Sequence, residues 1–184
     1  EPKFIPNQAV SIDLQEDLKI NVRLVDCVGY VIEGASGYQD DSGIRLVKTP
    51  WYNESIPFDQ AAKIGTKKVI QDHSTIGIVM TSDGSFLDIE ERNYHQATQD
   101  IIEELQNIGK PFIVIVNSKD PSSTTCQNVV ESYRQKHDVP VVAMDVTNML
   151  ETQVVHLLQE ALNEFGVKEV KIEVPRYIAM LSRN

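Results

Sequence analysis

Residues 20–29, with the sequence INVRLVDCVG, decide how the rest of this chain is interpreted. They have the pattern of a largely apolar strand that ends at Asp26, with Gly29 three residues further on. Upstream, residues 10–14 alternate apolar and polar side chains, and residues 16–17 favour a turn, so we expect a hairpin. Because open α/β sheets bind ligands at the carboxyl ends of their strands, Asp26 and Gly29 are the first candidate site residues.

The remaining chain alternates helical and strand-like patterns. The expected helices cover 58–72, 93–108, 124–137 and 151–165, and the expected strands cover 75–81, 111–117, 139–144 and 167–174. The apolar runs 75–81 and 111–117 are typical of strands buried on both faces. Strands that alternate with helices predict a three-layer α/β domain with a mostly parallel sheet.

Composition disfavours several classes of protein. Asp and Glu number 27 against 17 Lys and Arg, which gives a net charge of -10. An acidic surface disfavours nucleic acid as the main partner and direct attachment to an anionic membrane. No apolar run approaches the roughly 20 residues of a spanning helix, and no signal peptide is visible. We therefore expect a cytoplasmic protein without a transmembrane segment.

The pattern Asp-x-x-Gly at Asp26 and Gly29 has a defined chemistry in P-loop nucleotide hydrolases. There the aspartate holds a metal-bound water near the phosphates, and the glycine offers its N–H to the terminal phosphate. The phosphate cradle Gly-x-x-x-x-Gly-Lys-Ser/Thr does not occur in this sequence. We expect that loop, with the first strand of the fold, to lie upstream of Glu1, and without it we expect weak or no nucleotide binding.

A second candidate group follows the expected strand at 111–117. Asn117, Ser118 and Asp120 stand where translation-factor-related nucleotide-binding domains carry Asn-Lys-x-Asp, whose aspartate accepts two hydrogen bonds from guanine. Ser118 replaces the lysine that packs over the base, which puts guanine selectivity in doubt. A plain strand-to-turn transition explains the same residues. The order of the two motifs, with a strand–helix unit and a further strand between them, favours the nucleotide site.

Residues 30–57 form a long expected loop that is rich in glycine and aromatic side chains. Trp51 and Tyr52 belong to the residue types favoured at interface hot spots. One interpretation is therefore a contact surface, and the other is a loop whose aromatic side chains pack on the domain itself.

Several longer motifs carry a resemblance to a known family. They are 1–6 (EPKFIP), 24–30 (LVDCVGY), 49–52 (TPWY), 56–58 (IPF), 64–66 (IGT), 73–77 (HSTIG), 109–112 (GKPF) and 160–162 (EAL). Over nearly the whole chain they resemble the family of stage IV sporulation protein A, the spore-coat morphogenetic ATPases of endospore-forming bacteria.

The resemblance implies a P-loop domain, related to translation-factor-related GTPases, that uses ATP and magnesium. It implies that hydrolysis drives self-polymerisation into the basement layer of the spore coat, in the mother-cell cytoplasm at the outer forespore membrane. The implied partners are further copies of the protein, spore coat proteins and a small amphipathic membrane-bound peptide.

The resemblance also assigns roles to residues. Asp26 would orient magnesium through a water, Gly29 N–H would contact the γ-phosphate, and Asn117, Ser118 and Asp120 would border the base. Tyr30 stands where many small GTPases have a glutamine that orients the attacking water, so we expect slow turnover. Residues 1–174 would be the hydrolase-like domain, incomplete at its start, and residues 175–184 would begin a linker.

Two further hypotheses remain open. A GTPase with relaxed base selectivity would keep Asp120 as its base reader, and an inert scaffold would use residues 34–57 as its contact surface. A parallel sheet without its first strand has unpaired edges, so we expect a separate chain, or residues outside this sequence, to fill the gap.

Overall fold

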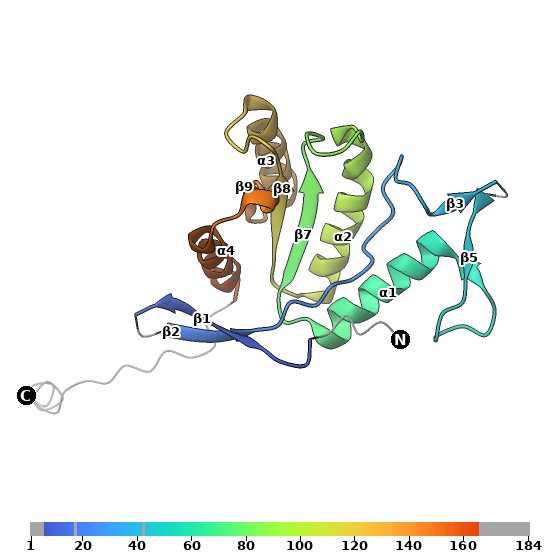
Figure 1. Ribbon diagram of the computed structural model, residues 1–184, viewed down its shortest axis with the longest axis horizontal. Coiled ribbons are helices and arrows are strands. Elements are labelled where there is room, and N and C mark those ends of the chain that lie inside the picture. Colours follow the sequence, from blue (N-terminus) through green and yellow to red (C-terminus); the bar gives the residue numbers. More distant parts are fainter. Residues whose placement is uncertain (1–5, 17, 42, 166–184) are drawn as a thin grey trace, which may run out of the picture.

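The computed structural model describes residues 6–16, 18–41 and 43–165, and its centre is a parallel three-stranded sheet (Figure 1). The strands are β7 (Gly77–Ser82), β8 (Phe112–Asn117) and β9 (Val141–Met144), in the order β7-β8-β9. Ser82 lies opposite Asn117, and Asn117 lies opposite Met144. The carboxyl ends of the three strands therefore meet at one edge, and the loops that follow them share it.

Helices cover both faces of this sheet. They are α1 (Phe58–His73), α2 (His95–Ile108), α3 (Thr124–His137) and α4 (Glu151–Asn163). Gly109, with φ 72°, caps α2, and Ser123 Oγ accepts a hydrogen bond from Cys126 N–H at the start of α3. The end of α2 and the full extent of α3 agree with the sequence prediction.

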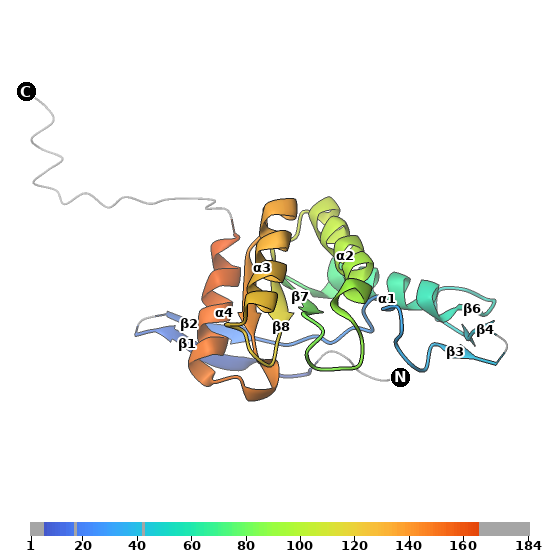
Figure 2. The ribbon, with the colours of Figure 1, turned by 90° about the horizontal axis from the view of Figure 1, so that it is seen from above.

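The hydrophobic core has one part on each face of the sheet. Helices α2 and α3 pack on one face, where Ile102 and Val130 meet Val114. Helix α4 packs on the other face, where Ala161 meets Ile113 (Figures 1 and 2). This confirms an α/β fold with a parallel sheet between helices, and it is compatible with an NTPase-like fold.

The predicted hairpin is present but shorter than expected. Strand β1 (Val10–Gln15) pairs antiparallel with β2 (Leu18–Val22), apart from the central sheet. The prediction that the second strand runs to Asp26 is wrong, because Val22 pairs with Val10 at the start of β1. Within the described ranges no backbone partner remains for residues 23–26, so Asp26 lies in a connection after the strand.

Strand β7 is not buried on both faces, contrary to the prediction from its apolar sequence. Ile78 is 37% and Met80 49% exposed, whereas Val79 between them is buried. The reason is its edge position: helix α4 packs against β8 and β9, and the same face of β7 is left uncovered. Strand β8, at the centre, is buried on both faces as predicted.

Helix α1 packs on the protein through a face that contains a polar residue. Its buried residues are Ala62, Thr66 and Ile70, at the four-residue spacing of one helix face. Phe58 and Val69 are only partly buried. A threonine therefore stands in the middle of the buried face.

The long loop contains four short strands: β3 (Gln39–Asp40), β4 (Gly43–Ile44), β5 (Leu46–Val47) and β6 (Ile56–Pro57). Trp51 lies against α1, since a Cβ at Gly65 would stand 3.3 Å from its ring. The expected strand at 167–174 and the domain boundary after it lie outside the described residues.

Candidate functional site

Gly29 is bonded to α1 through both of its backbone polar groups. Its N–H donates to Thr66 Oγ1 at 2.9 Å, and the same hydroxyl donates to the Gly29 carbonyl oxygen at 3.3 Å. The φ of 80° lies in the left-handed region that favours glycine, and a Cβ there would meet no atom within 4 Å. The space beside Gly29 is thus open, while its N–H is turned to Thr66.

Asp26 is exposed and has no hydrogen bond or ion pair with any residue that the structure describes. Across the described ranges, no group of three or more His, Cys, Asp or Glu is placed to hold a metal ion. Mg²⁺ usually keeps several waters and binds through one or two carboxylates together with substrate phosphates. A single free carboxylate fits that mode of binding, in which water and nucleotide supply the other ligands.

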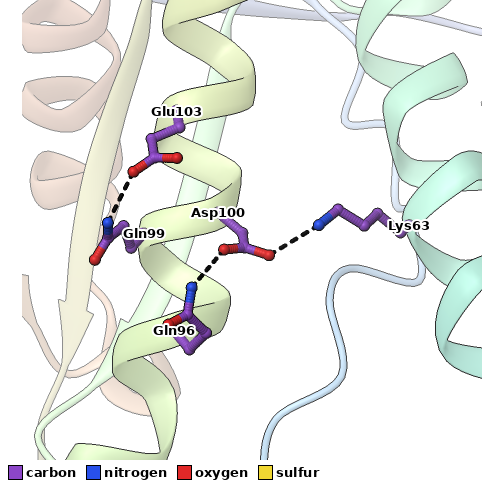
Figure 3. A network of polar contacts seen from close by, with 5 residues as sticks. All are labelled: Lys63, Gln96, Gln99, Asp100 and Glu103. Carbon is purple, nitrogen blue, oxygen red and sulfur yellow. Dashed lines mark hydrogen bonds and ion pairs between the residues drawn. The ribbon is translucent and has the colours of Figure 1, made fainter.

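Tyr30 is anchored between α1 and α2. Its ring lies under the Lys63 ammonium, 5.1 Å from Nζ to the ring centroid, and Lys63 also pairs with Asp100 of α2 at 2.8 Å (Figure 3). Burial, and then the nearby carboxylates of Glu104 and Asp100, raise the pKa of Tyr30 to about 12. Its hydroxyl is buried and has no hydrogen-bond partner among the described residues. The side chain therefore holds its segment against the helices.

Ser118 joins the carboxyl ends of β7 and β8. It is fully buried, its Oγ donates to Asp83 Oδ2 at 2.5 Å, and it accepts from Asp120 N–H at 3.1 Å. Partial burial acts to raise the pKa of Asp83, but hydrogen bonds from Ser118 and Ser85 outweigh it and lower the pKa below its usual value. The Ser118 side chain thus supports the loop and presents no surface to a base.

Asn117 and Asp120 shape the loop on either side of Ser118. Asn117 Oδ1 accepts from Val146 N–H at 3.1 Å and so ties the loop to the segment after β9. Asp120 Oδ1 accepts from Ser122 N–H at 3.1 Å and from Ser122 Oγ at 2.6 Å. One of the two oxygens that would read guanine is therefore engaged within the loop, and Oδ2 has no partner among the described residues.

Lys119 and Phe86 lie together at the same edge. Lys119 Nζ is 5.7 Å from the Phe86 ring centroid, and Lys119 N–H donates to Ser85 Oγ at 2.9 Å. This cation–π pair places a flat ring and a positive charge in the loops beside Asp120. Sequence reasoning missed Phe86, although an aromatic residue in the polar run after β7 was a visible signal.

A groove of about 680 Å³ separates the hairpin from the central sheet. Its walls include Ile20 and Val22 of β2, Ile76 and Ile78 beside and within β7, and Leu158 of α4. In the described part of the chain, β2 pairs only with β1 and β7 pairs only with β8. This agrees with the expectation of two unpaired edges, and what fills the gap stays a prediction.

The predicted site residues lie in two separate groups in the structure. Gly29 meets Thr66 of α1, whereas Asn117, Ser118 and Asp120 meet the loops after β7 and β9. No hydrogen bond joins the two groups within the described residues. Sequence reasoning missed Thr66, and the signal for it was a hydroxyl at the four-residue spacing of Ala62 and Ile70.

Among the described residues, no helix combines the length and apolarity that crossing a bilayer requires.

Comparison with known proteins gives one family. Residues 1–166 match the family described as stage IV sporulation protein A, ATPase domain. The chain is 50% identical over 182 residues to stage IV sporulation protein A of Bacillus anthracis and 49% identical over 184 residues to that of Bacillus subtilis (strain 168). It is 41% identical to that of Clostridioides difficile (strain 630). These alignments cover 99–100% of this chain but only 37–38% of the relatives. No solved structure matches the chain.

Proposed function

Because this chain belongs to the stage IV sporulation protein A family, we propose that it is the nucleotide-hydrolysing part of an ATP-driven protein that polymerises into the basement layer of the spore coat. The observation that carries the proposal is the match of residues 1–166 to the family's ATPase domain. Two features of the structure support it: the open space beside Gly29, and the exposed carboxylate of Asp26, which has no bond to any described residue.

Asp26 and Gly29 would act on the terminal phosphate of the nucleotide. Bound magnesium would supply positive charge that offsets the charge developing on the phosphates. Asp26 would orient one of the metal-bound waters, and Gly29 would donate its N–H to the γ-phosphate. Since that N–H is bonded to Thr66, the phosphate contact requires this bond to open.

ATP rather than GTP is the proposed substrate. The guanine signature is altered in two ways: Ser118 is buried against Asp83, and one oxygen of Asp120 is used by Ser122. Asn117 still ties its loop to the segment after β9, which would preserve the edge of a base pocket. Loss of the lysine that packs over the base, with one oxygen of Asp120 engaged within a retained loop, favours a changed base preference.

A GTPase with relaxed base selectivity is the second candidate. The observation in its favour is Asp120 Oδ2, which has no partner among the described residues and remains available as an acceptor.

Slow turnover is part of the proposal, because Tyr30 cannot replace a water-orienting glutamine here. Its side chain packs under Lys63, and its buried hydroxyl lacks a partner among the described residues. The attacking water would then be oriented by other groups or by assembly.

We propose that a further strand, followed by a phosphate-binding loop, docks in the groove between β2 and β7. Both neighbouring strands have a free backbone edge in the described part of the chain, and the walls are largely apolar. A parallel strand in this position would pair with both edges and join the hairpin to the sheet.

The proposed partners follow the family. They are other copies of the protein, spore coat proteins and a small amphipathic membrane-bound peptide, at the mother-cell side of the forespore membrane. Trp51 and Tyr52 are 43% and 51% exposed, which leaves the long loop at residues 30–57, here called the aromatic loop, available for such contacts.

The test is hydrolysis by the full-length protein with ATP and with GTP, each measured at increasing magnesium concentration. We expect magnesium-dependent release of phosphate from ATP that exceeds the release from GTP. Equal rates with the two nucleotides would favour the relaxed GTPase, and no release above a nucleotide-only blank would favour the inert scaffold.

A further inference from the structure

We propose that Thr66 competes with the γ-phosphate for the backbone N–H of Gly29, so that ATP binding must break a latch between residues 27–30 and α1. This inference rests on the proposed function, because it assumes that Gly29 senses the phosphate. It adds a positioning residue that acts through Gly29 and not through contact with the nucleotide.

The latch is a closed pair of hydrogen bonds. Thr66 Oγ1 accepts from Gly29 N–H and donates to Gly29 C=O, so both polar groups of one residue depend on one hydroxyl. Thr66 is 2% exposed, and its hydroxyl bonds only to Gly29 among the described residues. Moving the N–H to a phosphate would leave the Thr66 hydroxyl without this partner, and burial makes that loss costly.

Gly29 has the conformational freedom that such an exchange needs. Its φ of 80° is readily adopted by glycine, and a Cβ there would meet no atom within 4 Å, so there is open space on that side of the residue for a change of conformation. The bond to Thr66 Oγ1 gives the N–H its present direction, while Tyr30 holds the following residue under Lys63. In nucleotide hydrolases a segment of this kind is held by the γ-phosphate and released after hydrolysis.

Helix α1 connects the latch to the rest of the domain. Lys63, one turn before Thr66, holds the Tyr30 ring and pairs with Asp100 of α2 (Figure 3). Trp51 of the aromatic loop rests at Gly65, next to Thr66 in the chain. A change at Gly29 would thus alter the contacts of α1, and α1 also contacts the loop that carries Trp51.

The experiment compares three variants of the full-length protein. Thr66→Val removes the hydroxyl at nearly constant volume, Thr66→Ser keeps the hydroxyl, and Thr98→Val is the matched control. Thr98 is also buried, in α2, with 4% exposure, and its hydroxyl donates to Thr81 Oγ1 at 2.9 Å and not to Gly29. Hydrogen exchange of peptides that carry residues 27–32 is measured without nucleotide, with ADP and with a non-hydrolysable ATP analogue. Affinities for ADP and for a non-hydrolysable ATP analogue are measured in parallel.

We expect faster exchange at 27–32 in Thr66→Val and wild-type exchange in Thr66→Ser and Thr98→Val. Because Thr66→Val no longer has a bond to break, its affinity for the analogue should rise about two- to tenfold, with ADP affinity unchanged. Thr66→Ala, which also lacks the hydroxyl and is smaller, provides the same comparison if the valine variant does not fold.

Two results would overturn the inference in different ways. Wild-type exchange at 27–32 in Thr66→Val, or an equal change in Thr98→Val, would show that Thr66 does not hold the segment. Equal affinity of the wild type for ADP and the analogue, with the same exchange at 27–32, would show that Gly29 does not sense the γ-phosphate. That second result would overturn the proposed role of Gly29 and the competition with it.

Discussion

Ser118→Ala should destabilise the domain by about 2–3 kcal/mol at pH 7, because it removes the hydroxyl that joins the ends of β7 and β8. The bond from Ser118 Oγ to the Asp83 carboxylate, at 2.5 Å, is worth about 1.5–3 kcal/mol as a bond to a charged group. The bond from Asp120 N–H, at 3.1 Å, adds about 0.5–1.5 kcal/mol. Because solvent reaches Asp83, water can hydrogen-bond to its carboxylate in the variant. The destabilisation should therefore stay below the upper limit of the sum of the two bond energies.

The loss should also depend on pH. The pKa of Asp83 in the folded chain lies below its usual value of 3.8, so its carboxylate stabilises the fold above that value. This stability is lost as the pH falls through the lowered folded pKa. Removing Ser118 takes away one of the bonds that lower the pKa, so the difference between wild type and Ser118→Ala should shrink below about pH 4.

The assay is urea unfolding at pH 7 and pH 3, followed by the fluorescence of Trp51, the one tryptophan in the sequence. Ser122→Ala is the matched control, because Ser122 is exposed and its hydroxyl bonds to Asp120 alone among the residues that the structure describes. The control should stay within about 0.5 kcal/mol of wild type. If Ser118→Ala behaves like Ser122→Ala at pH 7, the buried network does not stabilise this edge of the sheet, and the reasoning is refuted.

Three other predictions concern Tyr30, a turn glycine and the aromatic loop. The free energy of unfolding of the wild type should fall between pH 10 and about 12, because Tyr30 ionises there in the unfolded chain but not in the folded one. Tyr30→Phe should reduce this fall, as measured by urea unfolding. An equal fall in both proteins would contradict the burial of the hydroxyl. Gly84→Ala should lower the free energy of unfolding by about 2 kcal/mol or more, because φ is 83° and the new Cβ would stand 2.9 Å from Glu91 N. Thermal unfolding measures this change, and an unchanged melting temperature would contradict the conformation of this turn. If the domain acts mainly as a scaffold, Trp51→Ala with Tyr52→Ala should block sedimentable assembly and leave ATP hydrolysis intact, and assembly that survives would exclude this contact.

Local signals explain why much of the fold was predictable from sequence. Gly109 marked the end of α2, and the alternation at residues 10–14 marked the hairpin. Such signals depend on neighbouring residues alone. The exposure of Ile78 and Met80 was not predictable in this way, because it depends on which strand lies at the edge and where α4 packs.

In the candidate site too, local patterns were predictable from sequence, and contacts between distant residues were not. The pattern Asp-x-x-Gly identified Gly29, but its bond to Thr66 joins residues 37 positions apart and could not be inferred from spacing. The sequence pattern indicates only that Ser118 replaces a lysine that would pack over the base. Its burial against Asp83, 35 positions away, follows from the register of β7 and β8.

The central claim is that Asp26, and not Asp120, is needed for ATP hydrolysis in the intact protein. The most direct measurement is the ATP hydrolysis rate of full-length protein that carries Asp26→Ala, beside the same protein with Asp120→Ala. We predict that Asp26→Ala lowers the rate about 10–100-fold, as loss of an outer-sphere metal contact does, and that Asp120→Ala leaves it near wild type. Equal rates for wild type and Asp26→Ala would contradict the account.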